Sequence, residues 1–126
     1  MTNTITVDRH PSSARLARGF VIDRLSGYEQ RLVDDAALMT SELVTNSIRH
    51  ATGTVTVTVA IDADTLHIAV SDGGPATPVI RTHSPSEPSG RGLQIVAALA
   101  DDWGVTPTPD AGNTVWLTLR LEFGAR

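Results

Sequence analysis

Two amino acids are missing from this sequence altogether. It has no cysteine, which excludes disulfide bonds, thiolate metal sites and cysteine nucleophiles. It has no lysine either, so all 10 basic residues other than histidine are arginine. Mechanisms that depend on a lysine, such as those of the P-loop and of ordinary protein kinases, are therefore excluded.

Aromatic residues, long apolar runs and positive charge are also scarce. Aromatics make up only 4% of the chain, so the core has to be built from valine, leucine, isoleucine and alanine. No apolar run approaches the ~18 residues of a membrane span, and the segment 1–10 is too polar for a signal peptide. The cytoplasm is therefore the expected location. The net charge of -4 argues against a nucleic-acid-binding protein, which usually carries a basic patch.

The length and composition of the chain indicate one domain covering residues 1–126, large enough to bury about two-thirds of the surface that the unfolded chain exposes. The periodicities predict an α+β fold, a two-layer α/β sandwich whose mostly antiparallel mixed sheet has helices on one face. A loop is expected over 72–90, which holds four of the seven prolines. The expected strands are 5–7, 54–59, 66–70, 103–106 and 113–121, and the expected helices are 11–25, 29–50 and 93–100.

A row of polar side chains lies on the second predicted helix. Glu42, Asn46 and His50 are spaced four residues apart, so they share one face beside an apolar stripe. A carboxylate and an amide on adjacent turns can hold a hydrated Mg²⁺ and orient a hydroxyl, since hard cations prefer oxygen ligands. A solvated helix face is the alternative, and for this segment alone it is the better supported one. His50 fits either a pocket residue or a helix-end histidine.

Three further segments have the residue types of a nucleotide site. Asp72 ends an apolar strand, where its carboxylate could accept a hydrogen bond from the amine of adenine, and Gly74 would let a flat ring approach the backbone. The segment 90–93 opens a helix, whose free N–H groups and positive dipole end favour a phosphate. The segment 112–114 begins the last strand. Taken singly, the first and third of these segments are better explained by a turn, and the second is weak evidence beside a plain loop-to-helix junction.

In their order and spacing, these four segments resemble the N, G1, G2 and G3 boxes of the GHKL ATPases. The chain has Glu-x-x-x-Asn on a helix, Asp-x-Gly at a strand end, Gly-x-Gly-Leu before a helix and Gly-Asn-Thr at a late strand. That superfamily includes gyrase, histidine-kinase catalytic domains and anti-sigma-factor serine kinases. The whole chain resembles the compact anti-sigma-kinase branch. The runs 42–51 and 90–105 are similar to those of its actinobacterial members.

The resemblance implies a Bergerat fold with ATP and Mg²⁺ as ligands. Asn46 would be the magnesium ligand, Glu42 the general base, and Asp72 the partner of the adenine amino group with Gly74 beneath the ring. Thr114 would lie on the adenine side of the sheet. An ATP lid would span 76–89, and the phosphates would be contacted by Gly90, Arg91, Gly92 and Leu93.

The implied reaction is transfer of the ATP γ-phosphate to a serine or threonine of an anti-anti-sigma protein of the STAS type. Once phosphorylated, that partner releases the kinase, which then sequesters a sigma factor. The resemblance implies no direct contact with nucleic acid or a membrane. Both a monomer and a homodimer are compatible with the sequence.

The sequence departs from the family pattern around the predicted lid. Ala76 stands where the fuller first glycine box has its second glycine, and 87–89 (Glu-Pro-Ser) lies where kinase-competent relatives often have a basic residue. ATP binding is therefore better supported than phosphotransfer. An inactive nucleotide-binding regulatory module, acting through protein contact alone, is the main alternative. A histidine-kinase catalytic domain, which would need a phosphoacceptor helix pair, and a STAS-type protein explain the motifs less well.

Overall fold

Five strands form one antiparallel sheet in the computed structural model of this chain, which describes residues 2–50, 53–72, 88–107 and 112–121. They are β1 (Thr2–Val7), β2 (Val55–Asp62), β3 (Thr65–Asp72), β4 (Asp102–Pro107) and β5 (Asn113–Arg120). Their order across the sheet is β1-β2-β3-β5-β4, and each neighbouring pair is antiparallel. The sequence predicted all five strands, and the sheet that it expected to be mixed is antiparallel throughout the described part.

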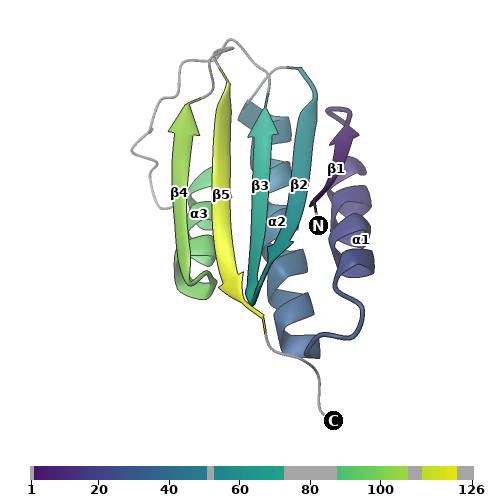
Figure 1. The fold of residues 1–126 in the computed structure, drawn as a ribbon. Coiled ribbons are helices and arrows are strands. Elements are labelled where there is room, and N and C mark those ends of the chain that lie inside the picture. Colours follow the sequence, from purple (N-terminus) through teal and green to yellow (C-terminus); the bar gives the residue numbers. More distant parts are fainter. Residues whose placement is uncertain (1, 51–52, 73–87, 108–111, 122–126) are drawn as a thin grey trace.

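Three helices, α1 (Ser13–Arg24), α2 (Gln30–His50) and α3 (Pro88–Leu99), lie on one side of this sheet (Figure 1). The central helix α2 packs against both α1 and α3, while α1 also contacts β1 and α3 contacts β4. The predicted two-layer α+β sandwich is therefore confirmed. Among the described helices, none is both long and apolar enough to cross a membrane.

Strict alternation in the strands explains why only one face of the sheet is covered. In β2, Val55, Val57 and Val59 are buried, whereas the threonines between them are not. The buried valines face the helices because successive side chains of a strand point to opposite sides. The core between the layers is formed by residues from all three helices and from the strands, including Val21, Met39, Leu43, Ile68, Val96 and Leu117.

The start of α3 differs from the sequence prediction. A helix was expected only from about residue 93, after a glycine-rich turn, but α3 begins at Pro88. Proline suits the first position of a helix, because its missing N–H group would have no intrahelical partner there. Gly90 and Gly92 consequently lie inside the first turns of the helix rather than before it.

Candidate functional site

The end of β3 and the beginning of β5 bring two predicted segments together. Ser71 pairs with Thr114 in the sheet, so Asp72 and Asn113 lie side by side at the next step. The backbone N–H of Asn113 donates a hydrogen bond to Asp72 Oδ1 over 3.1 Å. Both side chains are on the helix-facing side. Two residues away on each strand, Val70 belongs to the core and Val115 packs against it. This contact fixes the half-buried Asp72 carboxylate at the edge of the core.

Close packing of α3 against α2 brings the second glycine segment near the polar row of α2. A Cβ atom added to Gly92 would stand 3.1 Å from Asn46 Nδ2 and 3.5 Å from the backbone oxygen of Glu42. Only glycine leaves the two helices this close without displacing a neighbour. Glu42 and Asn46 are both half-buried, one turn apart on α2. The structure therefore gathers the predicted metal ligand, the predicted base and the second glycine box in one place.

The first turns of α3 offer backbone donors at this junction. The first four N–H groups of a helix have no partner within it, and the helix dipole makes that end positive. Gly90 lies within this region of α3 and has no side chain to block an approaching anion. Leu93, in contrast, is half-buried and packs against the hydrophobic core, so its side chain stabilises the helix junction.

The structure does not bring Thr114 to the side of the sheet where Asp72 lies. Its hydroxyl is 2.8 Å from the hydroxyl of Ser71, on the face that no described helix covers. Asn113 takes the place expected for Thr114, and its Oδ1 is buried with no hydrogen-bond partner in the described part of the chain. Sequence reasoning missed Asn113, although the apolar Val115 and Leu117 on the same strand already marked the odd-numbered positions as inward-facing.

Several predicted features fall outside the described residues. These are Gly74 and the lid up to residue 87. For Arg91 and His50 the structure gives the backbone within α3 and α2 but no side-chain position, so their predicted contacts remain predictions.

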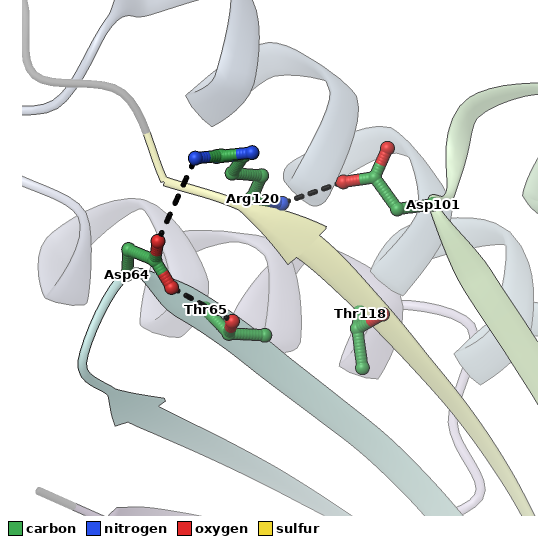
Figure 2. A pocket seen from close by; sticks show the side chains of 5 residues that line it. All are labelled: Asp64, Thr65, Asp101, Thr118 and Arg120. Carbon is green, nitrogen blue, oxygen red and sulfur yellow. Dashed lines mark hydrogen bonds and ion pairs between the residues drawn. The ribbon is translucent and has the colours of Figure 1, made fainter.

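A separate cavity of about 430 Å³ lies at the opposite end of the sheet, lined by Asp64, Thr65, Asp101, Thr118 and Arg120 (Figure 2). Arg120 Nη2 is 3.9 Å from Asp64 Oδ2, and its backbone N–H donates to Asp101 Oδ2 over 2.6 Å. The Arg120 and Asp64 side chains are 77% and 68% exposed, so this ion pair contributes little. The cavity is roughly 23 Å along β3 from Asp72, too far to be part of the same site.

Comparison with known families shows to which family the chain belongs. The profile of the histidine kinase-like ATPase domain (HATPase_c_2) matches residues 7–119. The chain belongs to this GHKL-type ATPase family. ATP binding follows from that membership as the family's common property, whereas the match says nothing of Mg²⁺. A comparison with curated proteins found no match.

Solved structures share the fold of this ATPase domain. The crystal structure of the RsbU and RsbW domains of Rv1364c from Mycobacterium tuberculosis matches with a TM-score of 0.76 and 24% identity, over 100% of this chain and 33% of that one. The histidine kinase domain of a blue-light-activated histidine kinase from Erythrobacter litoralis EL346 matches with a TM-score of 0.56 and 23% identity, over 71% of this chain and 44% of that one. This ATPase domain thus spans a third of the first structure's length.

The described residues of the ATPase domain fit a purine nucleotide. Asp72 provides a carboxylate for an amine, Asn113 provides a buried acceptor that lacks a donor, and Gly92 keeps α3 close to Asn46. No three His, Cys, Asp or Glu side chains gather to hold a metal ion in the part of the chain described.

Proposed function

We propose that this ATPase domain is a cytoplasmic serine/threonine kinase that uses Mg-ATP and acts on an anti-anti-sigma protein of the STAS type. Phosphorylation would release the domain from that protein and free it to sequester a sigma factor. The observation that supports this proposal best is the contact between Gly92 and Asn46. Gly92 lies one turn into α3, so this contact supports an arrangement in which phosphates bound by the N–H groups at the start of α3 are close to the predicted magnesium ligand, as phosphoryl transfer requires.

Each residue has a role that follows from its position. The side-chain oxygen of Asn46 would hold Mg²⁺, and the N–H groups at the start of α3 would bind the phosphates. Asp72 accepts a hydrogen bond from the adenine amino group. Glu42, one turn before Asn46, accepts the proton of the attacking hydroxyl. When bound, magnesium would supply positive charge that stabilises the transferring phosphoryl group.

Two observations support the anti-sigma branch. The runs 42–51 and 90–105 resemble those of anti-sigma-factor kinases, and the fold matches a structure that includes an RsbW domain over the whole length of this chain. Ala76 and the segment 87–89 favour a second candidate, a regulatory module that holds the nucleotide without transferring phosphate. The two candidates share the nucleotide site and differ in the chemistry at Glu42.

Thermal unfolding with and without Mg-ATP tests the shared site. At a hundred times its dissociation constant, a ligand stabilises the fold by about 2.7 kcal/mol, which for a domain of 126 residues raises Tm by about 10 °C. We expect this shift in the wild type and its loss in Asn46→Ala. Ser47→Ala, the neighbouring half-buried position on α2, is the matched control and should keep the shift. No shift in the wild type would refute nucleotide binding.

Transfer of labelled γ-phosphate to a STAS-type protein separates kinase from regulatory module. The wild type should label a serine or threonine of that protein. Glu42→Gln should keep the Mg-ATP shift in Tm but transfer phosphate about 10²–10⁴-fold more slowly, since it removes a general base. If the wild type binds Mg-ATP and labels no STAS-type protein, the regulatory-module candidate is correct.

A further inference from the structure

We infer that Asn113 reads the 6-amino group of adenine, as a second hydrogen-bond acceptor beside Asp72. This inference rests on the proposed ATP site and assigns a base-selecting residue within it. Its starting point is the Oδ1 atom of Asn113, which is buried and has no partner in the described part of the chain. A buried acceptor without a donor costs free energy, and native structures contain few of them. A ligand that brings an N–H group to this atom would remove that cost.

The position of Asn113 indicates which ligand group this is. Its own N–H binds Asp72 Oδ1 over 3.1 Å, so one residue fixes the carboxylate with its backbone and adds a carbonyl oxygen with its side chain. Strand alternation places both side chains on the helix-facing side, at the edge of the core. The site thus has two neighbouring acceptor groups.

Two acceptors select for a primary amine. The 6-amino group of adenine has two N–H bonds, one for Asp72 and one for Asn113 Oδ1. The 6-oxo group of hypoxanthine or guanine would instead bring oxygen lone pairs against both acceptors. A site built to bind an N–H group rejects an analogue that lacks it, because its own polar groups are then left unpaired. Asn113 therefore favours ATP over nucleotides with an oxygen at this position.

The test compares ATP, N6-methyl-ATP and ITP in direct binding measurements on wild type and Asn113→Ala. In the wild type, N6-methyl-ATP should bind about tenfold more weakly than ATP, and ITP more weakly still. In Asn113→Ala, ATP should lose about tenfold, and the methyl group should then cost less than twofold. Asn113→Leu, which keeps the side-chain volume without the acceptor, replaces the alanine variant if that does not fold. Thr118→Ala, on the opposite face of the same strand, should keep the wild-type preference.

The outcomes separate this inference from the proposal on which it rests. Failure of the wild type to bind any of the three nucleotides would refute the nucleotide site itself. If the wild type binds ATP but Asn113→Ala keeps its full affinity and preference, Asn113 does not read the base. If Asn113→Ala weakens all three nucleotides by the same factor, the Asn113 side chain supports the site without reading the base, and the inference is also overturned.

Discussion

Glycine at position 92 allows α3 to pack close to α2. At Gly92 an added Cβ would be 3.1 Å from Asn46 Nδ2, closer than ordinary van der Waals contact, so one of the two groups would have to move. Asn46 is the proposed magnesium ligand, and a metal ligand acts only at a defined distance. The glycine therefore serves the site rather than the helix, since a glycine inside a helix costs up to about 1 kcal/mol relative to alanine.

This reasoning predicts that Gly92→Ala has little effect on fold stability and a large effect on binding. Fold stability should change by less than about 1 kcal/mol, because the gain in helix propensity offsets the crowding. Affinity for Mg-ATP should fall about tenfold as Asn46 is displaced. Gly19→Ala is the matched control: it lies in α1, and a Cβ there meets no atom within 4 Å. It should stabilise the fold and leave affinity unchanged. Calorimetric titration and urea unfolding measure both quantities, and unchanged affinity in Gly92→Ala would contradict the argument.

At the scale of the elements, one-sided patterns made the helices and strands predictable. The valine–threonine alternation of β2 has no other explanation than a strand with one buried face. The start of α3 was not predictable in the same way, because proline, serine and glycine favour loops and helix N-termini alike. Thr114 was expected on the adenine side of the sheet because of its place in a motif. The side to which its side chain points is set instead by the strand, in which Val115 and Leu117 face the core. Because side chains alternate along a strand, a residue one position away points to the opposite face.

The pairing of β4 with β5 depends on a second close contact. Gly104 lies opposite Trp116, and a Cβ on Gly104 would be 2.7 Å from a ring atom of the indole. Gly104→Ala should therefore displace the indole and destabilise the fold by about 1–3 kcal/mol. Urea unfolding followed by tryptophan fluorescence measures both effects. Thr106→Ala, on the same face of β4, should stay within about 0.5 kcal/mol of the wild type. Equal stability of the two variants would show that the indole moves away without cost.

The described part of the molecule has one core, and the candidate site lies at one end of it. Residues from α1, α2, α3 and the strands meet in a single hydrophobic cluster, so no element is expected to unfold alone. Leu66, at the start of β3, is fully buried in this cluster. Asp72 is at the other end of the strand, roughly 20 Å away. The site and this part of the core lie far apart, yet both belong to the same cooperative unit.

In Leu66→Ala, the fall in Tm caused by the mutation and the rise in Tm caused by Mg-ATP should consequently be additive. Loss of a buried leucine side chain costs about 3 kcal/mol, which lowers Tm by about 11 °C for a chain of 126 residues. A saturating excess of Mg-ATP should still raise the Tm of this variant by about 10 °C, because sites more than 10 Å apart contribute independently. His67→Ala, the exposed neighbour on the uncovered face, should leave Tm almost unchanged. Calorimetry should show one transition in every case. A second transition that alone responds to Mg-ATP would mean that the end of the sheet near Asp72 unfolds separately from the core at Leu66.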